Sequence, residues 1–255
     1  MPLIESERAR LYYEVRGEGR PLVFAHGAGG NAAVWWQQVP AFAKRYRVVT
    51  FDHRGFGRSI CDPEDVDATL FEQDLSRILD HAGVERAVIV CQSMGGITGV
   101  RMAVFQPERV AGLVLANTPG AVVTEEVAEA MRQNIEQMQR EGPVGSLALS
   151  PEFGERDPAG EFLYHQINAF NPNPVDFSRL VAAALADEAL AGFDVPTLMI
   201  TSELDRLFPA HAIRSAAPKL GARVIEVPGA GHSTYFERPD VFNGLVDDFL
   251  QECGW

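Results

Sequence analysis

Three side chains that could together carry out nucleophilic catalysis stand at the ends of three apolar runs. Ser93 follows RAVIVCQ, Asp205 follows VPTLMITSEL, and His232 follows ARVIEVPGAG. A serine hydroxyl is a weak nucleophile at neutral pH, so it needs a base to remove its proton. That base in turn needs a carboxylate to fix its tautomer. Each residue alone would more often be a turn or surface residue, but the three in one register indicate a catalytic triad.

For two of these catalytic roles, a residue nearby in the sequence is an alternative candidate. Cys91 stands two residues before Ser93, where the nucleophile motif G-x-S-x-G has glycine. That position packs against the sheet and must be small, which cysteine satisfies as a small buried hydrophobe. We therefore expect Cys91 to point into the sheet and Ser93 to be the nucleophile. Glu203 is the local rival of Asp205, and strand alternation does not decide between them.

Strand-like and helix-like patterns alternate along most of the chain, and this order could bring the three residues together. Strands are predicted at 9–17, 21–27, 46–52, 86–93, 110–118, 195–205 and 222–232. Helices are predicted at 31–45, 70–83, 94–106, 209–221 and 238–255. Such alternation predicts an α/β fold with a mostly parallel central sheet and helices on both faces. Ligands bind at the carboxyl ends of strands in open sheets, where these three residues stand.

The segment from 122 to 192 breaks this alternation. It contains helical patterns at 124–141, 161–170 and 175–190, a breaker-rich stretch at 142–160 predicted as a loop, and no pattern that fits a strand. We expect residues 1–121 and 193–255 to form one α/β core, and residues 122–192 to form a helical cap inserted into it.

Composition excludes several classes of partner. The chain has 22 Lys and Arg against 35 Asp and Glu, a net charge of −13, which argues against binding nucleic acid or an anionic membrane. Its three cysteines are far apart, which predicts a reducing compartment and no disulfide framework, and none has metal-ligand spacing. With no signal-peptide pattern and no apolar run of about 18 residues, a cytoplasmic protein is expected.

Five short motifs resemble the α/β-hydrolase fold family over essentially the whole chain. They are HGAGG (26–30), FDHRGFGRS (51–59), QSMGG (92–96), SELDRLFP (202–209) and GAGHS (229–233). The chain order Ser–Asp–His is also that of this family. The region from SMGGITGV to LANT resembles the esterase and enol-lactone hydrolase branch. The resemblance implies that Asp205 is the triad acid. Asn117, where some relatives carry the acid, is not acidic.

The oxyanion hole is expected to consist of two backbone N–H groups. Met94 begins a helix, where N–H groups are free and the helix dipole is positive. The resemblance implies that Ala28 supplies the second donor. His26 is expected to be structural, its ring fixing the Ala28 loop, and His53 and Arg54 are also expected to be structural.

An apolar substrate pocket is expected near the catalytic loops. Its candidate lining residues are Trp35, Trp36, Met131, Phe162, Phe170 and Phe208. Apolar enclosure favours a small ester or lactone.

These observations predict a serine hydrolase that cleaves a small or medium carboxylic ester or lactone through an acyl-enzyme. No metal or organic cofactor is implied, and a monomer or homodimer is expected. A hydrolase that breaks a C–C bond of β-diketone-like substrates with the same triad is one alternative. A ligand receptor that retains the triad but turns over slowly is the other.

Overall fold

The chain folds around one mostly parallel β-sheet. The computed structural model describes residues 3–141, 147–171 and 177–255. The sheet order is β1-β2-β4-β3-β6-β7-β8-β9, with the short β5 paired to β2. The strands are β1 (Leu3–Ser6), β2 (Ala9–Arg16), β3 (Arg20–Ala25), β4 (Tyr46–Phe51), β5 (Ile60–Cys61), β6 (Ala87–Gln92), β7 (Val110–Ala116), β8 (Thr197–Ser202) and β9 (Arg223–Val227). From β4 to β9 all neighbours are parallel, whereas β1, β2 and β5 pair antiparallel.

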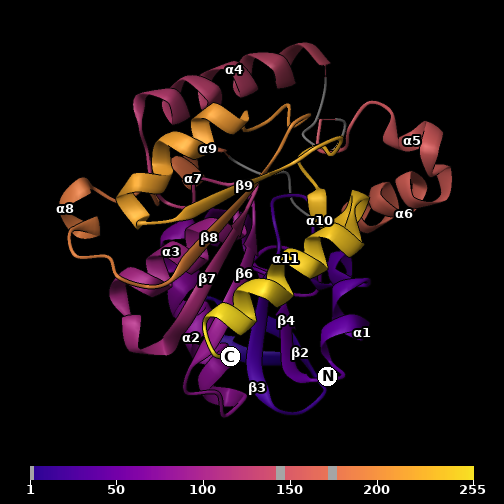
Figure 1. The fold of residues 1–255 in the computed structure, drawn as a ribbon. Helices are drawn as coiled ribbons and strands as arrows, with labels where there is room; N and C mark the ends of the chain where they lie inside the picture. Colours follow the sequence, from indigo (N-terminus) through magenta and orange to yellow (C-terminus); the bar gives the residue numbers. More distant parts are fainter. Residues whose placement is uncertain (1–2, 142–146, 172–176) are drawn as a thin grey trace.

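Helices cover both faces of this sheet (Figure 1). The α-helices are α1 (Gln38–Phe42), α2 (Phe71–His81), α3 (Gly95–Phe105), α4 (Glu125–Glu141), α5 (Phe153–Arg156), α6 (Pro158–Ala169), α7 (Phe177–Val181), α8 (Asp187–Leu190), α9 (Ala210–Ala216), α10 (Thr234–Glu237) and α11 (Pro239–Glu252). Apolar residues of α2, α3 and α9 pack on one face, and those of α1 and α11 pack on the other. The predicted sheet with helices on both faces is confirmed.

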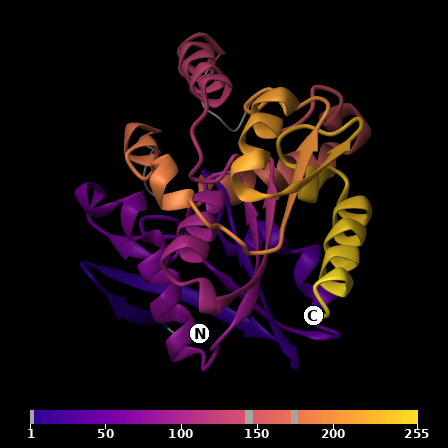
Figure 2. The ribbon, with the colours of Figure 1, turned by 60° about the vertical axis from the view of Figure 1, so that its left-hand side comes forward.

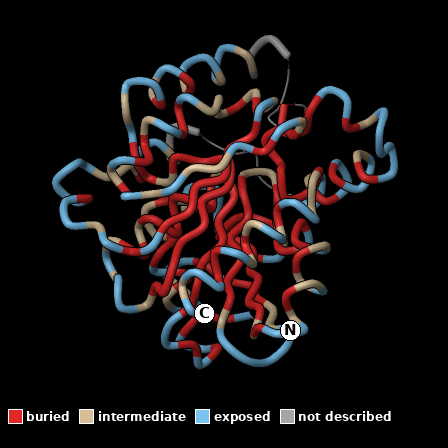
Figure 3. Tube along the Cα trace, in the orientation of Figure 1, coloured by how far each residue is buried: buried red, intermediate tan, exposed pale blue. Residues whose placement is uncertain are grey.

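The central strands are buried on both sides because neighbouring side chains point to opposite faces. In β6, Ile89 and Cys91 join the core under α2 and α3, while Val88 and Val90 join the core under α11. Figure 3 shows that these strands are buried over nearly their whole length. Consecutive apolar residues, rather than alternating ones, are the sequence pattern of such strands.

Helices α4 to α8 occupy the chain between β7 and β8, and the described residues there form no strand. In Figures 1 and 2, α4 stands at one end of the molecule, and its residues Val127 and Ala130 pack against Ala212 of α9. The loop prediction for 142–160 is wrong for 153–156 and 158–160, which are helical, and 142–146 lie outside the described residues. The Asp157 side chain caps α6 by accepting from the Gly160 N–H, and Pro158 is the first residue of that helix.

The described helices were also compared with the length and apolarity that a membrane-crossing helix needs. None of them meets both requirements.

Candidate active site

Ser93 lies in a tight turn between β6 and α3. Its φ is +49°, in the left-handed region that non-glycine residues rarely adopt. Its N–H donates to the carbonyl of Ala116 at the end of β7, over 3.0 Å. A Cβ on Gly95 would lie 2.3 Å from the Ala25 carbonyl oxygen, so only glycine lets α3 start this close to β3. This geometry is that of a strained strand-to-helix turn that presents one serine at the sheet edge.

Cys91 is not at this edge. Its side chain is fully buried, and a Cβ on Gly99 of α3 would lie 2.5 Å from its Sγ. Burial raises the pKa of the Cys91 thiol far above its ordinary value. The cysteine that replaces the usual glycine therefore fills the space between β6 and α3, as a packing residue.

His232 and Asp205 form a buried pair in the loops after β9 and β8. His232 Nδ1 lies 3.1 Å from Oδ1 and 3.0 Å from Oδ2 of Asp205. The carboxylate requires the ring to carry its proton on Nδ1, which leaves Nε2 with a lone pair. That Nε2 is buried and makes no hydrogen bond with any described residue. His232 Nε2 can therefore accept a proton, as a general base must.

The Asp205 carboxylate is held by three further donors. Oδ1 accepts from the N–H groups of Leu207 and Phe208, over 2.8 and 2.9 Å, and Oδ2 accepts from Asn117 Nδ2 over 3.0 Å. Glu203 is exposed and accepts from the Gly229 N–H instead. The structure therefore brings Asp205, and not Glu203, to the histidine.

Asn117 was noted in the sequence only for lacking a charge, and its positioning role was missed. It lies after β7 with a φ of +53°. Besides Asp205, its side chain donates to Ser202 Oγ over 2.8 Å and accepts from Thr234 Oγ1 over 2.8 Å. A polar residue directly after a strand, at the same sheet edge as the triad, is the signal that could have found it.

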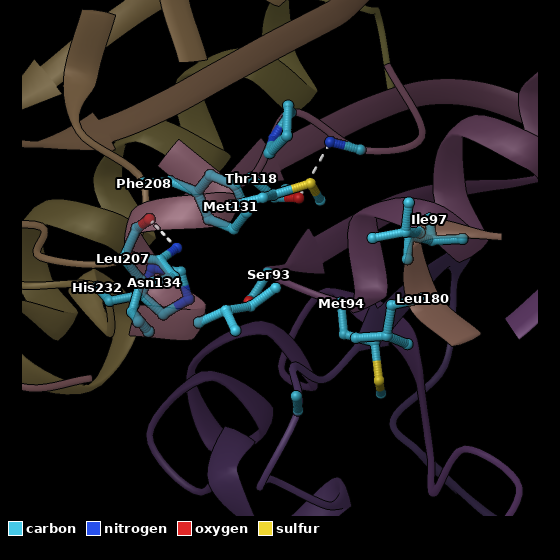
Figure 4. A pocket seen from close by; sticks show the side chains of 15 residues that line it. Ser93, Met94, Ile97, Thr118, Met131, Asn134, Leu180, Leu207, Phe208 and His232 are labelled. Carbon is cyan, nitrogen blue, oxygen red and sulfur yellow. Dashed lines mark hydrogen bonds between the residues drawn. The ribbon is translucent and has the colours of Figure 1, made fainter. Parts of the chain in front are cut away.

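The two predicted oxyanion donors flank Ser93. Ala28 and Met94 both line the pocket that contains Ser93 and His232. Met94, Ser93 and His232 are labelled in Figure 4. Met94 is the N-cap of α3, so its N–H has no partner within that helix. A Cβ on Gly27 would lie 2.0 Å from Gln92 Oε1 and 2.9 Å from Ser93 Cβ. The Ala28 loop is therefore packed directly against the serine turn.

The pocket beside Ser93 is narrow and apolar. Its cavity volume is about 80 Å³. The side chains around it come from the strand ends and from α3, α4 and α7. They belong to Ala28, Ser93, Met94, Ile97, Thr118, Pro119, Gly120, Met131, Asn134, Ile135, Leu180, Val181, Leu207, Phe208 and His232. No Lys, Arg, Asp or Glu is among the described residues that line it.

Only two of the six predicted pocket residues lie there. Met131 and Phe208 line the pocket (Figure 4). The prediction is not supported for the other four. Trp35 is fully buried against Phe24, Tyr235 and Phe242 in the core under α11, and the remaining three point to solvent. These are Trp36, Phe162 and Phe170, which are 48%, 65% and 76% exposed.

The helices between β7 and β8 are tied to the histidine loop. Tyr164 Oη on α6 lies 3.0 Å from Ser233 Oγ. The buried Glu237 carboxylate accepts from the N–H groups of Ser150 and Gly231, over 2.9 and 3.0 Å. Burial raises the pKa of Glu237 above its ordinary value. These contacts hold the loop that carries His232 against Ser150 and Tyr164, in the segment between β7 and β8.

A strained serine, a carboxylate-bound histidine and an α/β sheet that presents both define a class of protein. A family model described as "alpha/beta hydrolase fold" matches residues 20–239, and the chain belongs to this family.

Particular members of this family are similar over the whole chain. The Azorhizobium caulinodans protein named "Putative carbamate hydrolase RutD" is 32% identical, and the alignment covers 99% of each chain. The "3-oxoadipate enol-lactonase 2" of Acinetobacter baylyi is 27% identical, with 97% of this chain and 96% of the relative covered. The solved enol-lactonase of Burkholderia xenovorans LB400 is 25% identical, with a TM-score of 0.81 and 98% and 100% of the two chains covered.

Proposed function

We propose that this α/β hydrolase cleaves small or medium, uncharged carboxylic esters or lactones through an acyl-enzyme on Ser93. The observation that carries the proposal is the buried His232–Asp205 pair, whose ring nitrogen Nε2 lacks a partner in the described chain and shares a pocket with the strained Ser93. The lactonase names of two relatives support the lactone class.

In the first half of the reaction, Ser93 Oγ attacks the carbonyl carbon while His232 Nε2 takes the hydroxyl proton. The carbonyl oxygen gains a negative charge, which the N–H groups of Met94 and Ala28 stabilise. The tetrahedral intermediate then collapses, the bond to the leaving oxygen breaks, and His232 gives its proton to that oxygen. Asp205 keeps the imidazolium oriented and balances its charge throughout.

In the second half, water replaces the alcohol. His232 removes a proton from the water as the water oxygen attacks the acyl carbon. Collapse of the second intermediate breaks the bond to Ser93, and the proton on His232 returns to the serine oxygen. A lactone follows the same steps, but its leaving oxygen stays attached to the acyl chain.

The pocket supports the size and charge of the proposed substrate. It is narrow and lined by apolar side chains from α3, α4 and α7, and its polar members besides Ser93 and His232 are Thr118 and Asn134. A charged acyl chain would lose its hydration without gaining an ionic partner there. Long acyl chains would have to displace α4 or α7.

A carbamate is the second candidate, because the relative from Azorhizobium caulinodans bears that name. A carbamate presents the same acyl carbon to Ser93, with nitrogen in place of a carbon substituent. The triad and oxyanion donors act on it without change.

The test is a panel at equal concentration of p-nitrophenyl butyrate, a γ-lactone, an alkyl carbamate and a vinylogous β-diketone. We expect turnover of the ester or the lactone, and loss of that turnover in Ser93→Ala. Turnover of the diketone alone would favour C–C bond hydrolysis. Release of one equivalent of product per protein molecule, with almost no further turnover, would favour a receptor.

A further inference from the structure

Three buried side chains form a hydrogen-bonded row beneath the loop that carries Ala28. His26 Nδ1 lies 2.8 Å from the Gly27 carbonyl oxygen, and His26 Nε2 lies 3.1 Å from His53 Nδ1. At the other end of the row, His53 Nε2 lies 2.8 Å from Thr98 Oγ1 on α3. All three side chains are nearly or fully excluded from solvent.

The backbone fixes which atoms in this row carry the protons. The His53 N–H donates to His26 Nε2 over 2.9 Å, so His26 Nε2 is an acceptor and the proton of the neutral ring is on Nδ1. His53 Nδ1 lies 3.1 Å from the same nitrogen, where a lone pair would face and repel that of His26 Nε2. A proton on His53 Nδ1, sharing this acceptor with the backbone N–H, avoids that repulsion and makes His53 Nε2 an acceptor for the Thr98 hydroxyl. The row therefore runs in one direction, from Thr98 through His53 and His26 to the Gly27 carbonyl.

Both rings are in an environment that keeps them neutral. Burial lowers the pKa of His26, and burial together with the neighbouring His26 lowers the pKa of His53 well below its ordinary value. Neutral rings are required for this pattern, because a protonated ring would donate at both nitrogens.

The row ends on the peptide unit that contains the Ala28 N–H. The Gly27 carbonyl accepts from His26 Nδ1 and also from the Gly30 N–H, over 3.1 Å, so both of its lone pairs are used. Gly29, with a φ of +86°, lets the chain turn between these donors. In a trans peptide the N–H points away from the carbonyl. Two donors on the Gly27 oxygen thus hold the Ala28 N–H on the opposite side of the peptide, and Ala28 lines the pocket.

We propose that Thr98, His53 and His26 are positioning residues for the oxyanion hole. The row holds the plane of the Gly27–Ala28 peptide and polarises it, because hydrogen bonds in a chain strengthen one another. The Ala28 N–H becomes a better donor, aimed at the oxygen that gains charge in the transition state. Thr98 also belongs to α3, whose N-cap residue Met94 supplies the other donor, so the row couples the two donors. This inference rests on the proposed serine hydrolase function.

The variant that tests the row is Thr98→Val, which removes only the hydroxyl that starts it. Since loss of one oxyanion donor costs about 10²–10³ in rate, weakening a donor should lower kcat for p-nitrophenyl butyrate about tenfold, with KM unchanged. Thr98→Ser restores the hydroxyl and should keep kcat within about twofold of wild type. Thr201→Val is the matched control, because Thr201 is a buried threonine whose Oγ1 makes no hydrogen bond with any described residue.

The same variants also show when the inference fails. If Thr98→Val and Thr201→Val both have the wild-type kcat, the row has no catalytic role. If Thr98→Val and Thr98→Ser lose activity equally, or lose it in proportion to folded protein, the role of Thr98 is structural. A wild-type enzyme inert toward every ester, lactone and carbamate would instead overturn the proposed function.

Histidine tautomers measured by ¹H–¹⁵N NMR provide a readout that needs no activity. In wild-type protein and in Ser93→Ala, His26 and His53 should both be neutral and protonated on Nδ1. A proton on Nε2 of His26 would contradict the row, because that nitrogen could not accept from His53.

Discussion

Asn117 donates from Nδ2 to Oδ2 of Asp205 over 3.0 Å, and so links the end of β7 to the loop after β8. This bond occupies the carboxylate oxygen that lies closest to the histidine ring. An amide at the end of β7 therefore supports a carboxylate at the end of β8, two strands that are direct neighbours in the sheet.

The assignment of the triad acid predicts unequal effects for two neighbouring carboxylates. Asp205→Asn should lower kcat by about 10²–10⁴, because the amide cannot hold the histidine in its active tautomer. Glu203→Gln, the matched control, should stay within about threefold of wild type, since Glu203 is exposed. A larger loss in Glu203→Gln, measured with p-nitrophenyl butyrate at pH 7.5, would overturn the assignment.

Pocket size should depend on α4 rather than on the exposed aromatics Phe162 and Phe170. Met131→Ala and Ile135→Ala remove side chains that line the pocket, so both should shift the kcat/KM profile toward longer acyl chains. Phe162→Ala and Phe170→Ala should leave that profile unchanged, because both side chains point to solvent. The profile is measured with p-nitrophenyl esters from acetate to palmitate. Highest efficiency on palmitate in the wild type would refute an enclosed pocket.

The pocket should discriminate against charged substrates, because no Lys, Arg, Asp or Glu is among the described residues that line it. The mono-p-nitrophenyl ester of succinate should have a kcat/KM at least about tenfold below that of the butyrate ester, because its carboxylate is desolvated without a partner. Ile135, at 44% exposure, lies where an added cation can reach both pocket and water. Ile135→Arg should therefore reduce the difference in kcat/KM between the two esters, and Phe162→Arg should leave that difference unchanged. Equal efficiency on both esters in the wild type would contradict an uncharged pocket.

The buried histidines should make the fold sensitive to mild acid. Unfolded His26 and His53 take up protons below about pH 6.5, their ordinary pKa, whereas burial lowers both values in the folded protein. The unfolded state then binds more protons, so the free energy of unfolding falls as pH decreases below 6.5. Each histidine contributes at most about 1.4 kcal/mol per pH unit.

Urea unfolding between pH 7.5 and 5.5 measures this slope. Glu237, whose pKa burial raises, acts in the opposite direction, so comparing variants isolates the histidine contribution. His53→Gln should reduce the slope. His165→Gln, at an exposed position, should keep the wild-type slope. The same slope in all three proteins would show that His53 is not held neutral.

The layout of the fold could be predicted because consecutive apolar residues mark buried parallel strands. The candidate triad could be selected because Ser93 directly follows β6, and because Asp205 and His232 lie in the loops after β8 and β9. The pocket could not be predicted in the same way. An aromatic residue has the same sequence signature in the core, as Trp35 does, and on the surface, as Phe170 does. Its position depends on how the helices between β7 and β8 pack, and no local pattern specifies that packing.

The hydrogen bonds that support the site could not be predicted for a related reason. The row from Thr98 to Gly27 joins residues from three separate segments, and its direction depends on one backbone N–H. The sequence indicated only that His26 is structural. Which atoms His26 contacts is decided by the tertiary structure.

The central claim is that Ser93 is the nucleophile, and covalent labelling tests it most directly. A fluorophosphonate should inactivate the wild-type enzyme and leave one adduct, which peptide mass spectrometry should locate on Ser93. Ser93→Ala should remain folded, take up no label and lose up to about 10⁶ of the wild-type kcat. An adduct on Cys91, or full activity in Ser93→Ala, would contradict the account.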